Sequence, residues 1–202
     1  MKHVLVTGFD PFGGETVNPS FEAVKRLPDE IAGAKIFKRE LPTVFGKAGE
    51  RLTREIEVVS PDLILCVGQA GGRNAVTPEL VAINYRDASL ADNAGRVCRG
   101  EPVVAGGPAA YFTRLDTAKI IGTLTEAGIP ARLSLSAGAF VCNDVMYTLL
   151  HLLETRFPAK TGGFIHVPYL PEQTEGKPGV FSLPLEEITR ALSLAIAAQI
   201  GD

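Results

Sequence analysis

The segment LILCV, residues 63–67, is an uninterrupted run of apolar side chains between Pro61 and Gly68. A strand with one face in water alternates apolar and polar residues, whereas an unbroken apolar run is typical of a strand buried on both faces. Strands of this kind belong to largely parallel sheets that helices cover on both sides. This segment therefore predicts an α/β fold with a central sheet.

Strand and helix patterns alternate on both sides of this segment. Further strands are predicted at 4–6, 35–40, 133–136 and 163–167, with another inside 77–84. Helices are predicted at 19–27, which begins at a proline, at 44–60, 116–127 and 143–156, and in a closing segment with the apolar stripe Leu185, Ile188, Leu192, Ala195 and Ile196. Because no repeat or linker interrupts this alternation, we expect one α/β domain over residues 1–202.

The composition narrows the classes of function. The chain has 202 residues, is 46% hydrophobic and 21% charged, and carries a formal net charge of -3. Its basic residues are scattered, which gives no electrostatic reason to expect nucleic acid or an anionic membrane as a partner. The first apolar run is too short for a signal peptide, and three cysteines without metal-type spacing fit a reducing compartment. We expect a cytoplasmic protein that acts on small molecules or peptides.

Reactive side chains follow several of the predicted strands. In open α/β sheets, ligands bind beyond the carboxyl ends of the strands. Polar or reactive groups stand at these places in 9–14, 68–73 and 137–143, and at His166. We expect these four places to converge on one site.

Cys142 is the candidate nucleophile, because it lies near the start of a predicted helix. Unpaired N–H groups and the positive end of the helix dipole favour a thiolate there, so this position predicts a lowered pKa. A cysteine nucleophile also needs a proton donor for its leaving group. His3 precedes the first strand, and His151 lies about 13 Å further along the same helix at ~1.5 Å per residue. His166, at the end of the next strand, is the remaining histidine.

A histidine base needs a third group that fixes its tautomer, and a carboxylate suits this role. The pattern leaves four candidates open, namely Asp10, Glu79, Asp92 and Asp144. Nothing in their spacing selects one of them.

The other two cysteines have less reactive interpretations, and a cysteine in an apolar segment is often only a small buried side chain. Cys66 lies inside a predicted strand, so we expect it in the core. Cys98 stands close to Arg96 and Arg99 in a predicted surface loop, where a raised thiolate fraction is expected.

Four motifs together resemble the pyroglutamyl peptidase I family. They are VLVTGFDPFGGETVNPS (4–20), GQAGGRNAVTPELVAIN (68–84), SLSAGAFVCND (134–144) and GFIHVPYLPEQ (163–173). Their order, spacing and total length match over essentially the whole chain. The resemblance implies a cysteine peptidase that removes N-terminal pyroglutamate from peptides without a metal or organic cofactor. It also implies a phosphorylase/hydrolase-like three-layer α/β/α sandwich with a mostly parallel, mixed sheet, and a homo-oligomer, either a dimer or a tetramer.

The resemblance also assigns roles to residues of this chain. It makes Cys142 the nucleophile, His166 the base and Glu79 the orienting acid of a triad that works through a thioester. The substrate pocket that it implies consists of Phe9, Phe12, Phe140 and Val141, with Asn18 and Gln69 near its polar edge and Thr43 and Leu90 as further members. Pyroglutamate is a flat lactam, which suits apolar walls and a few hydrogen-bonding groups.

Two departures from the family pattern raise an alternative hypothesis, although the intact triad positions still favour an active enzyme. Leu80 stands where the family usually has a basic residue, and Ser89 stands where its DARIPDN motif has arginine. Arg86 is a substitute in the same loop, although its odd offset on an extended segment points it to the other face. The alternative is a weakly active or inactive protein that binds pyroglutamyl peptides. Nucleoside phosphorylase activity is suggested by fold analogy alone, which is weak evidence for chemistry.

Overall fold

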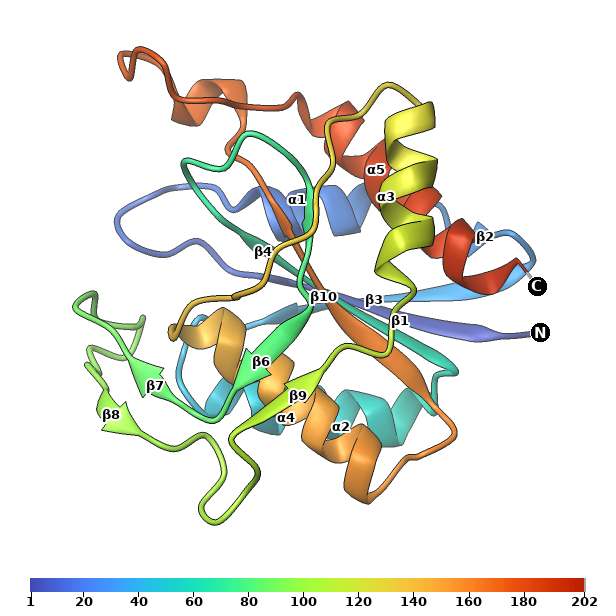
Figure 1. Cartoon of the computed structure of the whole chain (residues 1–202). Coiled ribbons are helices and arrows are strands. Elements are labelled where there is room, and N and C mark those ends of the chain that lie inside the picture. Colours follow the sequence, from blue (N-terminus) through green and yellow to red (C-terminus); the bar gives the residue numbers. More distant parts are fainter. Residues whose placement is uncertain (202) are drawn as a thin grey trace.

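The computed structural model of the protein describes residues 1–201 and has a six-stranded sheet at its centre (Figure 1). The strands lie in the order β2 (Glu30–Ile31), β3 (Ala34–Leu41), β1 (His3–Phe9), β4 (Leu63–Gln69), β10 (Thr161–Val167) and β5 (Thr77–Pro78). The inner four strands are parallel, while the short edge strands β2 and β5 are antiparallel to their neighbours. The predicted mostly parallel, mixed sheet is therefore confirmed.

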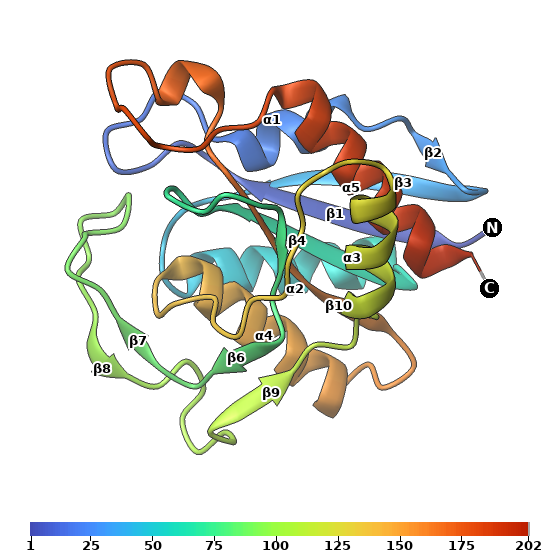
Figure 2. The same ribbon diagram turned by 45° about the horizontal axis from the view of Figure 1, so that its top comes forward.

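Helices cover both faces of this sheet, which makes three layers (Figures 1 and 2). Helices α1 (Pro19–Arg26), α3 (Thr117–Glu126) and α5 (Leu185–Ile200) pack on one face, and α2 (Lys47–Val59) and α4 (Val141–Thr155) pack on the other. The LILCV run serves both layers, because Leu65 faces the first group of helices and Ile64 faces the second. This two-sided burial explains why the run shows no polar alternation.

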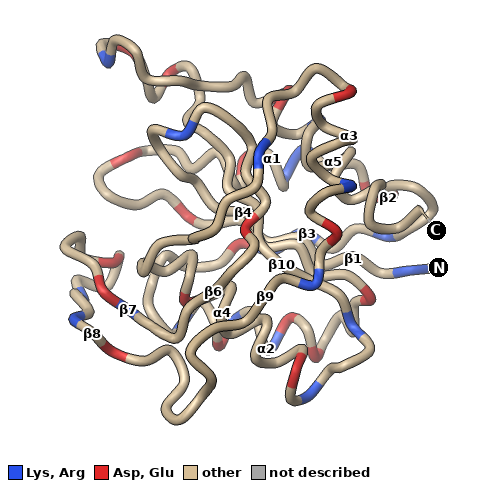
Figure 3. The backbone as a smooth tube through the Cα atoms, in the orientation of Figure 1, with Lys and Arg blue, Asp and Glu red and all other residues tan. Residues whose placement is uncertain are grey.

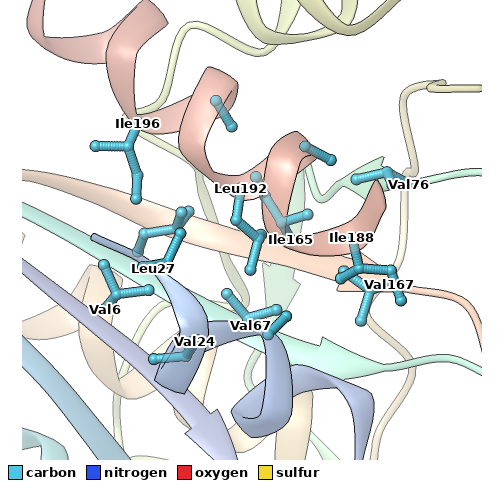
Figure 4. Close-up of a cluster of buried hydrophobic side chains, with 14 of the residues drawn as sticks. Val6, Val24, Leu27, Val67, Val76, Ile165, Val167, Ile188, Leu192 and Ile196 are labelled. Atoms are coloured by element: carbon cyan, nitrogen blue, oxygen red, sulfur yellow. The ribbon is translucent and has the colours of Figure 1, made fainter. Parts of the chain in front are cut away.

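Interlocking aliphatic side chains join α1 and α5 to the sheet (Figure 4). Val67 on β4 and Ile165 and Val167 on β10 point into a cluster with Val24 of α1 and Leu192 of α5. All five side chains have no exposed surface. Burial of apolar surface on this scale is the main force that holds the layers together.

Two small antiparallel sheets lie beside α4 (Figure 2). Strand β6 (Val81–Ile83) pairs with β9 (Ala110–Phe112), and β7 (Arg86–Asp87) pairs with β8 (Arg99–Glu101). A short 3-10 helix, Pro171–Gln173, follows β10. The two small sheets extend the layer of α2 and α4 beyond the central sheet, whereas the 3-10 helix lies on the side of α1 and α5 (Figures 1 and 2).

Two expectations about segment 133–156 need correction. The predicted strand at 133–136 makes only an isolated bridge between Ser134 and Glu79. Its apolar members, Leu133 and Leu135, are exposed, so the alternation of leucine and serine does not mark a face buried in the sheet. Helix α4 begins at Val141, two residues earlier than predicted, and Cys142 therefore lies in its first turn.

Charged residues of both signs are intermingled along the chain rather than gathered on one element (Figure 3). Within residues 1–201, no helix combines the length and the apolar character needed to cross a lipid bilayer.

The packing of α5 on the sheet gives a stability prediction. Leu192→Ala should lower the free energy of unfolding by about 2–5 kcal/mol, because the deletion leaves a cavity in a fully buried site. Leu135→Ala removes the same atoms from a side chain that is 68% exposed, and should change the free energy by less than about 0.5 kcal/mol. Urea denaturation of both variants checks this, and equal losses would contradict the assignment of Leu192 to the core.

Candidate active site

The central strands end together at one edge of the sheet, and the reactive side chains gather there. Gln69, the last residue of β4, pairs with Val167, the last residue of β10. Gly68 and His166 are the pair before them, so their Cα–Cβ directions share the face that α4 covers. The ends of β4 and β10, which belong to two of the four predicted places, therefore meet at this edge.

The thiol of Cys142 packs against the end of β4. A Cβ atom built on Gly68 would lie 2.9 Å from Cys142 Sγ and 2.7 Å from Phe164 Cζ. Only glycine allows the sulfur and the ring to approach the strand this closely. Because His166 is the paired neighbour of Gly68 on β10, the thiol and the imidazole lie on the same side of the sheet around one glycine.

Buried polar bonds hold the first turn of α4. The Asn143 side chain is fully buried and accepts a hydrogen bond from Ile83 N at 3.0 Å. Its Nδ2 donates to the carbonyl oxygens of Ile83 at 2.9 Å and Tyr85 at 3.0 Å. These bonds to the end of β6 and to the residues after it fix the start of α4, and with it the cysteine that precedes Asn143.

His166 and Glu79 form a buried pair. His166 Nδ1 lies 2.7 Å from Glu79 Oε1, and the two residues are 3% and 0% exposed. A carboxylate only accepts hydrogen bonds, so Nδ1 carries the proton and donates it to Glu79, which leaves the lone pair on Nε2. Backbone bonding also holds the acid beside β10, because Glu79 N donates to Phe164 O at 2.9 Å.

The pKa values of this pair favour a neutral imidazole beside a charged carboxylate. Burial lowers the pKa of His166, and this outweighs the opposing effect of its hydrogen bond to Glu79. Burial alone would raise the pKa of Glu79, but the hydrogen bond and charge of His166, helped by Ser134 and Arg73, hold it below its ordinary value.

The other three candidate carboxylates serve different partners. Asp10 accepts a backbone N–H at 2.7 Å, Asp92 accepts three backbone N–H groups, and Asp144 accepts one at 2.8 Å. Within residues 1–201, Glu79 is the carboxylate that bonds to His166. The geometry thus distinguishes one acid where the sequence pattern left four.

Arg73 is a site residue that sequence analysis missed. Its Nη1 donates to Glu79 Oε1 at 2.5 Å and to Thr77 Oγ1 at 2.6 Å, and its Nη2 donates to Ser136 O at 3.0 Å. It ends the segment 68–73, one of the four strand-end segments. A buried acid needs a cationic partner, but the burial of Glu79 is visible only in the fold, so no local sequence pattern points to Arg73.

Arg86 reaches the first turn of α4 through Asp144. Its Nε donates to Asp144 Oδ1 at 2.6 Å, and Asp144 is fully buried. The other oxygen of Asp144 accepts the N–H of Gly46 at 2.8 Å. Ser89, where the family resemblance leads us to expect arginine, is exposed. The guanidinium of Arg86 therefore binds a carboxylate in the first turn of α4, the helix that carries Cys142.

The expectation of a lowered pKa at Cys142 is wrong. Burial raises the pKa of Cys142 to about 12, the charge of Glu79 acts in the same direction, and the charge of Arg73 opposes them. The loss of hydration beside Gly68 and Phe164 outweighs the pull of the helix N-terminus. At neutral pH the resting site therefore holds a neutral thiol and a neutral imidazole.

The remaining cysteines are both buried. Cys66 lies within β4 without exposed surface, as predicted, and burial raises its pKa to about 12. The predicted surface position of Cys98 is wrong, because its side chain is also 0% exposed and packs in the core on the α4 side. Burial raises the pKa of Cys98 despite the nearby charge of Arg96, so its thiolate fraction is not increased.

Aromatic rings flank the thiol and the imidazole. Phe9 packs on Phe164 with ring centroids 6.3 Å apart, and Phe164 packs on His166 at 4.8 Å. Phe12, on the loop after β1, packs on Phe140 at 5.9 Å. Phe9 and Phe164 thus form a row of rings that ends at His166, whereas Phe12 and Phe140 lie at the start of α4.

Phe45 and Phe164 are aromatic members of this region that sequence analysis did not assign to the site. Phe45 packs edge-on against Phe140 with centroids 5.3 Å apart. Both occupy positions of ordinary core residues in the sequence pattern, so no local signal separates them from the rest of the core.

The predicted polar residues are bonded within the protein. Asn18 caps α1 by accepting from Ser20 N, and its Nδ2 donates to Asp10 O at 2.9 Å. Thr43 Oγ1 donates to the same carbonyl at 3.2 Å. Gln69 Oε1 accepts from Gln173 Nε2 at 3.0 Å. These bonds fix the loop after β1 and the end of β4.

Leu90 and Val141, the last predicted pocket residues, differ in exposure. Leu90 is 46% exposed, and a Cβ built on Gly13 would lie 3.7 Å from its Cδ2, so it lies against the loop after β1. Val141 is fully buried at the start of α4.

Known proteins resemble the chain over its whole length. A family model described as pyroglutamyl peptidase matches residues 2–202. A pyrrolidone-carboxylate peptidase of Enterococcus faecalis is 54% identical over 197 residues, which cover 98% of this chain and 92% of the relative. One from Chromobacterium violaceum is 54% identical over 197 residues, with 97% and 91% covered.

Solved structures of pyroglutamyl peptidases have the same fold as this chain. The crystal structure of pyroglutamyl peptidase I from Bacillus amyloliquefaciens matches with a TM-score of 0.97 and 48% identity, and covers 100% of this chain and 96% of its own. A variant of pyrrolidone carboxyl peptidase from Pyrococcus furiosus gives a TM-score of 0.94 at 45% identity, with 98% of each chain covered.

The raised pKa of Cys142 predicts how its thiol reacts. Alkylation of Cys142 by iodoacetamide in the ligand-free protein should keep accelerating from about pH 7 to about pH 10, because the thiolate fraction grows about tenfold per pH unit below the pKa. Peptide mapping measures the rate, with fully buried Cys66 as an internal control that stays unlabelled. A plateau below about pH 8 would show that the thiol is activated at rest.

The close approach at Gly68 predicts an overpacked variant. Gly68→Ala should lower the free energy of unfolding by about 1–3 kcal/mol, because the new methyl group displaces Cys142 Sγ or the Phe164 ring. Gly122→Ala, in α3, meets no atom within 4 Å and should raise it by up to about 1 kcal/mol. Denaturation of both variants checks the expectation, and equal stability of Gly68→Ala and wild type would refute it.

Proposed function

The chain belongs to the pyroglutamyl peptidase family, and we propose that it is a cysteine-type omega peptidase that removes N-terminal pyroglutamate from peptides by a Cys142–His166–Glu79 triad. The observation that carries the triad is the 2.7 Å hydrogen bond between His166 and Glu79. His166 on β10 is the paired neighbour of Gly68 on β4, and the Cys142 sulfur packs against Gly68.

The first step follows from the neutral resting state. The sulfur of Cys142 attacks the carbonyl carbon of the pyroglutamyl residue while Nε2 of His166 takes the thiol proton. Proton transfer during the attack is needed because the thiol of the free protein has a raised pKa. The carboxylate of Glu79 stabilises the imidazolium that forms and keeps its ring in place.

The second step releases the peptide, and the third frees the enzyme. His166 returns its proton to the departing amine as the carbon–nitrogen bond breaks, which leaves a thioester on Cys142. His166 then takes a proton from water, whose oxygen attacks the thioester carbonyl. The carbon–sulfur bond breaks, pyroglutamate leaves, and the thiol regains its proton.

The start of α4 is suited to stabilise the negative oxygen of the tetrahedral intermediates. The residue before the helix, Phe140, supplies no side-chain acceptor to the first N–H groups. These groups are therefore open to a ligand, and the positive end of the helix dipole reinforces them. We assign the oxyanion to the backbone N–H groups at Val141 and Cys142.

The lactam ring of the substrate fits the aromatic region described above. Phe12 and Phe140, together with the buried Phe9 and Val141, provide apolar surface for a flat ring. Gln69 accepts from Gln173 through its oxygen, which leaves its NH2 group as a donor for the lactam carbonyl. Proline lacks this carbonyl, and each buried polar group left unpaired disfavours it by about 1–3 kcal/mol.

The homo-oligomer implied by the family resemblance stays a prediction. Sedimentation equilibrium of the purified protein measures the subunit number directly, and a monomer at all concentrations would contradict it.

Turnover tests the proposed function. The wild type should release a fluorescent amine from a pyroglutamyl amide under reducing conditions and should refuse the matching prolyl amide. Cys142→Ala should abolish turnover, and Glu79→Gln should lower kcat by about 10²- to 10⁴-fold, because the imidazole loses its charged partner. Cys98→Ala, a matched loss of a thiol elsewhere in the core, should stay active.

Two results would contradict the proposed function. Thermal protection of folded wild type by a pyroglutamyl amide without amine release would identify a binding protein. Turnover that persists in Cys142→Ala would exclude the proposed nucleophile.

A further inference from the structure

Glu79 has a second partner besides the histidine. Its Oε1 accepts from His166 Nδ1 at 2.7 Å and from Arg73 Nη1 at 2.5 Å. We propose that Arg73 is a positioning residue of the reaction, which keeps Glu79 charged and directed at His166 and so extends the triad by one member. This inference rests on the proposed function of the triad.

The burial of the acid creates the need for such a partner. Glu79 has no exposed surface, and its second oxygen, Oε2, has no hydrogen-bond partner within residues 1–201. A carboxylate in this setting tends to take up a proton rather than stay charged. A protonated Glu79 would lose the charge that supports the imidazolium, and the guanidinium opposes this change.

The contacts of Arg73 also fix its direction. Nη1 donates to Thr77 Oγ1 at 2.6 Å, and Thr77 is the residue that pairs with His166 across β5 and β10. Nη2 donates to Ser136 O at 3.0 Å, on the segment that leads to the cysteine helix. The planar fork of arginine thus ties the acid to the surroundings of both the base and the nucleophile.

The charge of Arg73 influences all three triad members in the same direction. It lowers the pKa of Glu79, of His166 and of Cys142, although burial has the largest effect on each. Loss of this charge therefore makes each group harder to deprotonate. Lysine at position 73 would keep the positive charge but could not make the three hydrogen bonds of the guanidinium. The effect of the charge can therefore be separated from the effect of the hydrogen bonds.

A matched control lies beside Arg73. A cleft of about 340 Å³ is lined by Arg73, Thr77, Arg132, Leu133 and Ser134. Arg132 is exposed, and its side chain makes no hydrogen bond or ion pair with residues 1–201. Its replacement removes an arginine from the same cleft without removing a contact to the acid.

The test compares Arg73→Gln, Arg73→Lys and Arg132→Gln in the pyroglutamyl amide assay. Arg73→Gln should lower kcat by about 10- to 100-fold with KM within about threefold, the range expected for loss of a hydrogen bond between charged groups. The acid limb of its kcat/KM profile should shift to higher pH, because both His166 and Glu79 then hold protons more tightly. Arg73→Lys should keep the wild-type limb and recover part of kcat, and Arg132→Gln should match wild type.

A double mutant separates positioning from mere stability. In a Glu79→Gln background, Arg73→Gln should change kcat by less than about threefold, because the effect that passes through the acid is then absent and only the weaker direct effect of its charge on His166 and Cys142 remains. An undiminished loss in that background would overturn the proposal, as would wild-type kcat and an unshifted limb in Arg73→Gln alone.

Alkylation gives a readout that does not depend on turnover. Iodoacetamide should label Cys142 more slowly in Arg73→Gln than in wild type near pH 9, since the thiol pKa rises. An unchanged rate would overturn the proposal. Failure of wild type to cleave the amide would instead refute the proposed function, so the two failures are distinguishable.

Discussion

A carboxylate without exposed surface, Glu79, is the constraint around which the site is organised. A buried charge is tolerated only where partners compensate for lost hydration. The protein supplies an imidazole and a guanidinium on one oxygen, and a backbone bond that holds the acid beside β10. Glu79 follows the short strand β5, with β10 on one side of it and the extended segment around Ser134 on the other. The same contacts that keep Glu79 charged therefore also hold this edge of the sheet together.

Much of the fold could be predicted from local pattern, and the failures have a physical reason. Unbroken apolar runs such as LILCV predict strands buried on both sides, and this holds for β4. The segment at 133–136 has a strand pattern as well, but its leucines face solvent and Ser134 bridges to Glu79. Alternation shows that two faces differ, and tertiary structure decides which face is covered.

The candidate site was predictable in part, because position along the chain predicts proximity but not contact. Cys142 could be found because it lies near a predicted helix start, and His166 because it lies near the end of a predicted strand. The choice of Glu79 needed the family resemblance, and Arg73 was missed, because side-chain bonds across the loops have no local signature. The pKa of the thiol was predicted in the wrong direction for the same reason. The helix terminus is visible in the sequence, whereas the packing that removes water from the sulfur is not.

The sheet separates the molecule into two compartments with different freedom to change. The thiol and the imidazole stand on the face covered by α2 and α4, while α1, α3 and α5 cover the opposite face. The α1–α3–α5 layer can therefore accumulate substitutions that suit a new temperature or a new neighbour while the reacting atoms keep their geometry. We expect relatives to differ more in the α1–α3–α5 layer than around the site. The strands of the central sheet pack against both layers, so their residues must suit both.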